Sequence, residues 1–326
     1  MGFNYKGVGA VIEGKRIVVT GGAGFIGSNL VYNLYQNNDV KVIDNLSTGN
    51  IGNIFNLVEK KSIEMTKGSI NDLKLLQEFF SDVDYVLHQA AIPSVPKSIK
   101  NPLMTNKANI EGTLNVLVAA RDCNVEKVVF ASSSSVYGDA LTLPKIEGMV
   151  PSPLSPYAIT KLCGENYCRI FYEIYGLRTT SLRYFNVYGP RQDPKSEYAA
   201  VVPKFISSTL MGKPVKIYGD GEQTRDFTYV KDVINANLKS ILSKKADGKV
   251  LNIASGKRIS IYDLAMRIME ICGKKVDIKY SEKRTGDVDH SLADISLAKS
   301  ILDYNPKYSL EEGLKETIDY FEVNIN

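Results

Sequence analysis

A tyrosine and a lysine four residues apart are the side chains of this chain that most readily suggest chemistry. Tyr157 and Lys161 stand in the run Ser-Pro-Tyr-Ala-Ile-Thr-Lys. Residues at this spacing share one face of a helix, so the ammonium can lie beside the phenol. A free tyrosine has a pKa near ~10, and a neighbouring cation lowers it. The pair therefore predicts a general base that works near neutral pH.

A glycine-rich turn upstream suggests what such a base would work with. Gly21, Gly24 and Gly27 follow the expected buried strand 15–20 and open a helical pattern. Glycines there allow a tight turn and let the backbone approach a pyrophosphate at the helix N-terminus. Asp44 closes the next strand, where a carboxylate can bind the adenosine ribose and would repel a 2′-phosphate, which favours NAD over NADP. A base beside a bound hydride acceptor predicts an enzyme that oxidises an alcohol.

Short apolar runs alternate with longer amphipathic ones and must position these groups. We expect strands at 15–20, 40–44, 62–66, 85–88, 127–132, 179–183 and 250–254, and helices at about 25–36, 72–80, 102–122, 157–175, 260–271, 295–302 and 310–323. Ser155 as N-cap and Pro156 at the first helical position predict the start of the helix that carries Tyr157. The alternation predicts an α/β fold, a Rossmann-type doubly wound parallel sheet with a smaller mixed α/β substrate lobe. We expect residues 1–185 and about 225–255 to form the NAD-binding domain, and about 186–224 with 256–326 to form the substrate lobe.

Composition excludes several other classes of protein. The chain of 326 residues is 44% hydrophobic and 23% charged, with a net charge of +4. The sequence has no dense basic block, so we expect no nucleic-acid partner. No apolar run approaches the ~20 residues of a membrane span, so we expect no membrane partner. The four cysteines lack paired zinc spacing and there are only two histidines, so we expect no metal site. We expect a cytoplasmic protein, and we interpret His88 as structural.

Four segments together resemble one known family. They are Thr20–Gly27, His88–Ala91, Ser132–Gly138 and Tyr157–Lys161, in matching order and spacing. On these segments the chain resembles the extended short-chain dehydrogenase/reductases, specifically nucleotide-sugar 4-epimerases, along nearly its whole length. The resemblance implies that Ser133, Tyr157 and Lys161 are catalytic and that NAD is tightly bound and recycled. In such enzymes the tyrosine takes the O4 proton while the C4 hydride passes to NAD⁺, and the 4-keto sugar turns over before the hydride returns.

The resemblance also implies which residues hold each ligand. For the cofactor these are Gly21, Gly24, Phe25, Ile26, Gly27, Asp44, Asn45, Ser47, Thr48, Gly49, Ser69, Ile70, Gln89, Ala90, Ala91, Asn109, Tyr157, Lys161 and Tyr184. For the UDP-sugar they are Ser94, Ser133, Ser134, Tyr157, Asn186, Gln192, Val201, Val202, Lys216, Tyr218, Arg225, Arg284, Asp287 and Ser291. A homodimer paired through helices 102–122 and 157–175 is implied as well.

The choice of sugar depends on a few positions. Ser291 stands where enzymes of this type that are confined to non-acetylated sugars carry a bulky aromatic residue, so the resemblance favours UDP-N-acetylglucosamine, with UDP-glucose as the other candidate. A UDP-glucuronate 4-epimerase stays open, as does a nucleotide-sugar dehydratase or decarboxylase. Ser134 and Ser135 occupy the place of the acid pair that a dehydratase commonly has, which argues against elimination. A non-catalytic NAD-binding regulator is a further alternative, disfavoured by the intact Ser133, Tyr157 and Lys161.

Overall fold

A seven-stranded parallel sheet forms the centre of the molecule. The structure is a computed structural model that describes residues 10–194, 200–283 and 288–324. The sheet has the order β11-β6-β5-β4-β1-β2-β3, and every neighbouring pair is parallel. Its strands are β1 Arg16–Thr20, β2 Asp39–Asp44, β3 Glu64–Lys67, β4 Tyr85–His88, β5 Lys127–Ser133, β6 Arg178–Tyr184 and β11 Lys249–Ile253. The strand order reverses between β1 and β4, so the predicted doubly wound α/β fold is confirmed.

Strand β1 shows why these segments become central strands. Ile17, Val18 and Val19 are all fully buried. Ile17 and Val19 pack into the core on one face of the sheet and Val18 into the core on the other, because successive side chains of a strand point to opposite faces. A strand covered on both faces therefore has a continuous apolar sequence.

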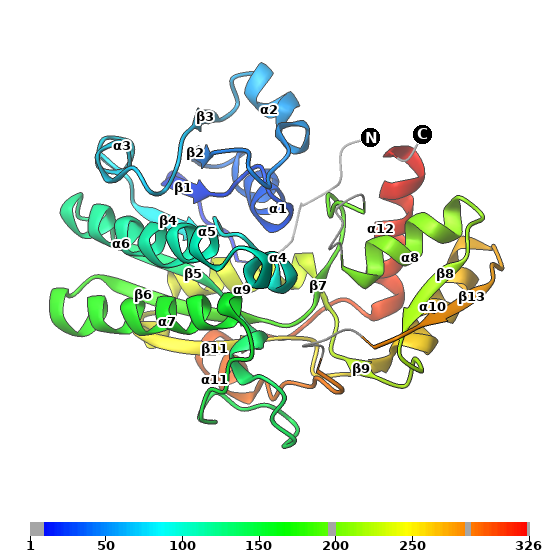
Figure 1. The fold of residues 1–326 in the computed structure, drawn as a ribbon. Helices are drawn as coiled ribbons and strands as arrows, with labels where there is room; N and C mark the ends of the chain where they lie inside the picture. Colours follow the sequence, from blue (N-terminus) through cyan, green and yellow to red (C-terminus); the bar gives the residue numbers. More distant parts are fainter. Residues whose placement is uncertain (1–9, 195–199, 284–287, 325–326) are drawn as a thin grey trace.

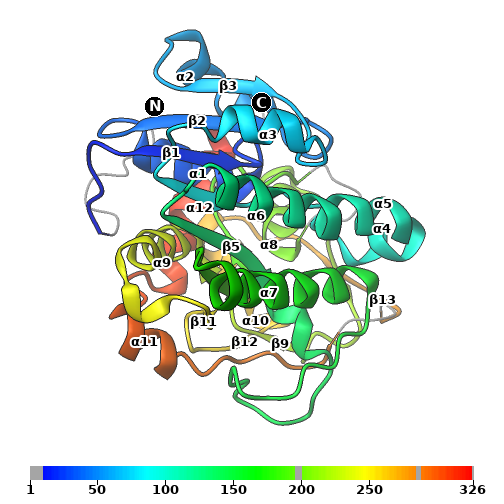
Figure 2. The ribbon, with the colours of Figure 1, turned by 90° about the vertical axis from the view of Figure 1, so that its left-hand side faces the viewer.

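Helices cover both faces of the sheet (Figures 1 and 2). One face carries α1 Phe25–Leu34, α9 Val230–Leu242 and α11 Ser296–Leu302, and the other carries α3 Leu73–Phe79, α6 Gly112–Asp122 and α7 Pro156–Tyr175. The shorter helices α2 Phe55–Glu59, α4 Val95–Lys100 and α5 Pro102–Asn106 lie in the connections, and α4 and α5 pack against α7. Within the residues that the structure describes, no helix combines the length and apolarity needed to cross a membrane.

A smaller lobe has a core of its own (Figure 1). Helices α8 Val201–Leu210, α10 Ile261–Cys272 and α12 Leu310–Asn324 pack together around the parallel pair β8 Val215–Tyr218 and β13 Ile278–Ser281. Two short pairs connect this lobe to the central sheet, β7 Val187–Tyr188 with β10 Thr228–Tyr229 and β9 Thr224–Arg225 with β12 Ile259–Ser260. The exact division of the chain into two domains stays a prediction.

The helix that carries Tyr157 begins where the sequence predicts. Ser155 is the N-cap of α7, and its hydroxyl accepts a hydrogen bond of 3.2 Å from the backbone N–H of Ala158. Pro156 occupies the first turn, where its missing N–H costs nothing. The helix ends at Gly176, whose φ of 72° is a left-handed cap. The predicted N-cap and helix start are confirmed.

The long helix expected at 102–122 is interrupted. Between α5 and α6, residues Lys107–Glu111 form a π-helical turn, a widened geometry that is common at functional sites. Asn109 lies within it and bonds through its amide to the backbone N–H of Ile92 at 2.8 Å and to Thr160 Oγ1 at 3.0 Å. The periodicity of the sequence does not reveal this turn because both flanking segments are helical.

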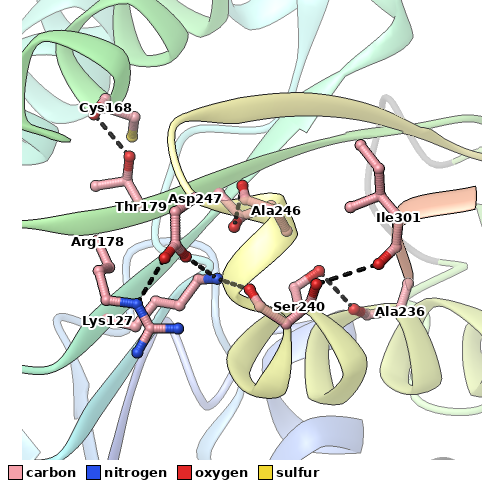
Figure 3. Close-up of polar contacts among 11 residues, drawn as sticks. Lys127, Cys168, Arg178, Thr179, Ala236, Ser240, Ala246, Asp247 and Ile301 are labelled. Atoms are coloured by element: carbon pink, nitrogen blue, oxygen red, sulfur yellow. Dashed lines mark hydrogen bonds and ion pairs between the residues drawn. The ribbon is translucent and has the colours of Figure 1, made fainter. Parts of the chain in front are cut away.

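A buried ion cluster joins the strands near the amino end of β5 (Figure 3). The Nζ of Lys127 lies 2.6 Å from Asp247 Oδ1, and Arg178 Nε lies 2.7 Å from Asp247 Oδ2. The Lys127 side chain is fully buried, and burial lowers its pKa to about 8 against the opposing effect of Asp247. These contacts join the starts of β5 and β6 to the turn before β11, at the opposite edge of the sheet from the glycine turn.

Candidate active site

The glycine turn between β1 and α1 leaves no room for side chains. Gly21 has a φ of +70°, and a Cβ there would stand 2.8 Å from the backbone N and Cα of Ala90. A Cβ on Gly27 would stand 2.2 Å from the carbonyl oxygen of Gly21. Only glycine permits this packing, which places the N-terminus of α1 at the carboxyl edge of the sheet, where a phosphate can accept hydrogen bonds from its free N–H groups.

Asp44 at the end of β2 is held by the same turn. Its Oδ2 accepts a hydrogen bond of 3.0 Å from the N–H of Ala23, and its Oδ1 accepts one of 2.8 Å from the N–H of Leu46. Burial raises the pKa of the carboxyl, and these two backbone bonds oppose the rise. Each carboxylate oxygen has a second lone pair, so the fixed group can still accept hydrogen bonds from a ribose.

An elongated cavity of about 460 Å³ runs along this edge of the sheet. It is lined by these residues that the sequence suggests for the cofactor: Gly21, Gly24, Phe25, Ile26, Gly27, Asp44, Asn45, Ser47, Thr48, Gly49, Ser69, Ile70, Gln89, Ala90, Ala91, Tyr157, Lys161 and Tyr184. From Asp44 on β2 to Lys161 over β5 the cavity crosses three strand spacings, or ~14 Å. The glycine cradle, the Asp44 carboxylate and this length fit an extended dinucleotide.

The sequence did not predict some of the residues that line this cavity. Lys97 on α4, with Met104 on α5 and Lys107 and Ala108 in the π-helical turn, faces the same cavity. They follow β4 in the chain, which places them near the site, but no motif shows which of their side chains turn inward. Asn109 differs from expectation: it is 2% exposed and its amide braces Ile92 against α7. Its contact with the cofactor stays a prediction.

Tyr157, Lys161 and Ser133 come together between α7 and the end of β5. The Lys161 Nζ lies 5.8 Å from the centre of the Tyr157 ring and donates a hydrogen bond of 2.8 Å to the carbonyl oxygen of Ala131. The backbone N–H of Tyr157 donates to Ser98 Oγ on α4 at 3.1 Å. Ser133 is hydrogen-bonded to the Tyr157 side chain. The phenol is thereby fixed with a hydroxyl and an ammonium on its flanks.

The pKa of Tyr157 differs from the expectation. Burial raises it, and the hydrogen bond from Ser133, rather than Lys161, is the interaction that lowers it. Burial also lowers the pKa of Lys161 to about 8, and Cys168 and Glu165 oppose this fall. The spacing of the two residues was sufficient to predict their proximity, but the sequence could not show how strongly both are desolvated.

His88 lies behind the site. The ring is 1% exposed and bonds to Thr20 Oγ1 at 2.8 Å and to Thr113 Oγ1 at 3.0 Å. Burial lowers its pKa to about 3, so the imidazole is neutral at physiological pH. It braces β1 and α6 across the end of β4.

The residues expected for the UDP-sugar lie partly around a second cavity. A space of about 250 Å³ is lined by Asn186, Val201, Val202, Lys216, Tyr218 and Arg225. An adjoining space of about 310 Å³ shares Tyr218 and Arg225. The arrangement joins the carboxyl end of β6 to the smaller lobe, so a ligand there would bridge both parts of the molecule.

The remaining expected substrate residues have varied surroundings. Ser291 is 7% exposed, and its Oγ accepts a hydrogen bond of 3.5 Å from the Asn186 amide. The Gln192 amide donates to the carbonyl of Val187 at 3.2 Å. Ser94 is the N-cap of α4 and Ser134 begins the 3₁₀ turn after β5. Arg284 and Asp287 lie outside the described residues.

The Arg225 guanidinium, which the resemblance assigns to the substrate, is bonded to backbone carbonyl groups. It donates to the backbone carbonyls of Thr224 at 2.9 Å, Asp289 at 3.0 Å and Val288 at 2.6 Å. These bonds hold β9 to the segment that leads to Ser291. A role in binding phosphate stays a prediction.

Side chains suited to a metal ion do not gather in the part of the chain that the structure describes. No three His, Cys, Asp or Glu residues in those ranges form a group that could hold one.

Comparison with known proteins gives the context of this site. Residues 17–254 match the NAD dependent epimerase/dehydratase family. The chain belongs to this family. Similar solved structures include the UDP-N-acetylglucosamine 4-epimerase of Methanobrevibacter ruminantium M1 in complex with UDP-N-acetylmuramic acid, which is 44% identical with a TM-score of 0.92 over 96% of this chain and 100% of that one. The UDP-glucose 4-epimerase of Thermotoga maritima with UDP-glucose is 40% identical, with a TM-score of 0.91 over 95% of this chain and 100% of that one. The UDP-glucuronic acid 4-epimerase of Bacillus cereus with UDP-glucuronic acid and NAD is 36% identical, with a TM-score of 0.88 over 95% and 99%.

Proposed function

We propose that this protein inverts C4 of a UDP-hexose with NAD kept bound, and that UDP-N-acetylglucosamine is its preferred substrate. The observation that carries the proposal is the meeting of Tyr157 and Lys161 in the dinucleotide cavity, with Ser133 bonded to the phenol. The similar structures of 4-epimerases for three UDP-sugars support the reaction class.

In this reaction the chain's own residues remove and return the proton of the sugar O4 hydroxyl. When bound, NAD would supply a reversible hydride acceptor for C4. The Tyr157 phenolate takes the proton from O4 as the alcohol becomes a ketone and gives it back as the ketone becomes the alcohol of inverted configuration. Ser133 holds that phenol by a hydrogen bond, and the Lys161 ammonium lies 5.8 Å from the centre of its ring.

The size of the side chain at 291 supports an N-acetylated sugar. Ser291 packs beside Asn186, with 3.5 Å between the amide and the hydroxyl. A small residue there leaves room that a bulky aromatic side chain would fill. One such contact discriminates by only ~1–3 kcal/mol, so UDP-glucose is a second substrate of the same reaction and the ratio of the two must be measured.

The test is an incubation of the purified protein with UDP-N-acetylglucosamine, UDP-glucose and UDP-glucuronate, without added NAD. Chromatography and NMR of the products should reveal C4 epimers, no accumulated NADH and the highest turnover with the acetylated sugar. Loss of water or carbon dioxide would instead identify a dehydratase or decarboxylase. Epimerisation of the glucuronate alone would replace the proposed sugar, and no turnover with bound NAD would favour a regulator.

A homodimer is part of the proposal. Helices α4, α5 and α7 pack beside one another and carry exposed apolar side chains. Ile99 is 56%, Leu103 is 82% and Ile159 is 52% exposed. A second copy of this surface would cover them. Sedimentation at micromolar concentration should give a dimer that Leu103→Glu weakens, whereas a monomer at every concentration would refute it.

A further inference from the structure

A buried carboxylate lies one helical turn beyond the lysine of the site. Glu165 is 4% exposed. It follows Lys161 on α7 at the same four-residue interval by which Lys161 follows Tyr157. The three side chains therefore share the face of α7 that lies against β5. A buried carboxylate is expensive unless it is paired, so its partners show what it does.

Glu165 binds two neighbouring strands of the sheet at once. The hydroxyl of Ser132 on β5 donates to its Oε1 at 2.5 Å. Arg183 on β6 binds it through two bonds, Nε to Oε1 at 2.8 Å and Nη2 to Oε2 at 2.7 Å. Ser132 and Arg183 are directly paired in the register of β5 and β6. One side chain of α7 thus fixes both strands where β5 reaches Ser133.

These bonds continue along the segment that bears Ser133. Lys161 is bonded to Ala131, the residue before Ser132. On the far side, the Arg183 guanidinium lies 4.7 Å from the ring centre of Tyr137, which ends the turn after β5. The residues from Ala131 to Tyr137 are therefore held by α7 on one side and by β6 on the other. A shift of Glu165 would move Ser133 relative to Tyr157.

The charges around Lys161 make Glu165 important in a second way. The groups that face the ammonium are Tyr157, Glu165 and Cys168 on α7, His88 on β4 and the ring of Phe130 on β5, with Arg183 on β6 behind Glu165. His88 is neutral because burial lowers its pKa to about 3, and Cys168 is neutral because burial raises its pKa to about 12. Glu165 is therefore the one carboxylate among these named groups, and it faces Lys161 and Arg183.

The two cations would respond differently to the loss of that anion. Arginine does not give up its proton in proteins, whereas a buried lysine does so readily. If the carboxylate were neutral, Arg183 would stay charged and unpaired, and Lys161 would lose its proton at lower pH. If Arg183 were replaced by a neutral residue instead, the carboxylate would have only Lys161 to balance it. Lys161 would then keep its proton to higher pH.

We propose that Glu165 is a positioning residue of this site, which fixes the Ser132–Ser133 strand end and keeps Lys161 charged beside Arg183. The part that concerns turnover rests on the proposed epimerase function. The part that concerns the charge of Lys161 does not, because it can be measured without substrate.

Two variants of opposite sign test the proposal. Glu165→Gln keeps the size of the side chain and removes its charge, and Arg183→Met removes the opposing charge. The matched control is Glu173→Gln, which neutralises a carboxylate on the same helix that is 49% exposed and paired with Arg169. The readout is the titration of Lys161 in the purified holoprotein, followed by ¹³C NMR of ε-labelled lysine and assigned with Lys161→Met.

Glu165→Gln should move the Lys161 titration to lower pH by about one pH unit or more, the range for loss of a nearby opposite charge. Arg183→Met should move it to higher pH, and the double variant should return it close to wild type. The alkaline limb of the turnover profile should follow each shift, while Glu173→Gln leaves both unchanged. A Lys161 titration that stays put, or moves the same way in both single variants, would overturn the proposal.

The design remains informative if one variant does not fold. Removing one partner of a buried pair is strongly destabilising, whereas replacing both with neutral groups is often tolerated. If Glu165→Gln does not fold, the direction in which the Lys161 titration moves in Arg183→Met, compared with the double variant, tests the proposal. If the wild-type protein has no epimerase activity but the variants show these Lys161 titration shifts, the proposed function is refuted. The role of Glu165 in keeping Lys161 charged would still be supported.

Discussion

Replacing Gly27 with alanine should remove bound NAD at a modest cost in stability. The added Cβ would stand 2.2 Å from the Gly21 carbonyl oxygen and 2.9 Å from the Cα of Gly22. An ordinary contact of ~3.4 Å requires the start of α1 to retreat by ~1 Å, and close-packed interiors accept such overpacking at ~1–3 kcal/mol. The retreat withdraws the N–H groups that the glycine turn offers to a pyrophosphate.

The loss of affinity follows from those N–H groups. A hydrogen bond to a charged group contributes ~1.5–3 kcal/mol. Losing one raises the Kd for NAD by roughly 10- to 150-fold, because each ~1.4 kcal/mol is a factor of ten. The folded molecule should otherwise persist, since the substitution lies at one end of α1.

The assay is the NAD content of the purified protein, released by acid and counted per mole of chain, together with the Kd from calorimetry. Gly148→Ala is the control, because a Cβ at that position meets nothing within 4 Å. Wild-type NAD content in a folded Gly27→Ala protein would contradict the assignment of this turn to the cofactor. Loss of NAD from the control as well would show that the assay reports general damage.

Three further predictions concern specificity, pH and stability. Ser291→Tyr should lower kcat/KM for UDP-N-acetylglucosamine by ~10- to 200-fold and change that for UDP-glucose far less, so equal losses would exclude a gate at this position. Because the pKa of Lys161 is lowered to about 8, its ammonium is lost as the pH rises through that value. The kcat/KM should therefore fall above about pH 8, and a flat profile up to pH 10 would be inconsistent with a role for that charge. Asp247→Asn leaves Lys127 and Arg178 without their carboxylate, so the free energy of unfolding in urea should fall by ~3–5 kcal/mol. Turnover of this variant should stay within about twofold because Lys127 and Ser133 lie at opposite ends of β5, ~20 Å apart, and a selective loss of turnover would contradict that separation.

Local signals in the sequence were sufficient for much of the fold. The cap at Ser155 and the proline after it determine the start of α7 without help from distant residues. The glycine spacing around Gly24 predicts the β1 turn for the same reason. The π-helical turn around Asn109 could not be predicted, because the partner of its amide is Ile92, which precedes α4 and is distant in the sequence.

The parts of the site that the sequence did not reveal depend on strand register and burial. In the sequence, Glu165 resembles an ordinary helix carboxylate. The pairing of β5 with β6 places Ser132 and Arg183 side by side, where both bind Glu165. The raised pKa of Tyr157 has the same origin, since desolvation is a property of the packed site rather than of two residues four apart. Spacing predicted which groups meet, and packing determines their charges.

The most direct test of the central claim follows the hydrogen on the reacting carbon. UDP-N-acetylglucosamine labelled with deuterium at C4 should be incubated with wild-type protein and with Tyr157→Phe, both without added NAD, and the C4 label should be measured by NMR. The account predicts that wild type inverts C4 and keeps the deuterium on that carbon, and that the phenylalanine variant retains its NAD but loses nearly all inversion. Exchange of the label with solvent during inversion, or near-normal inversion by Tyr157→Phe, would contradict it.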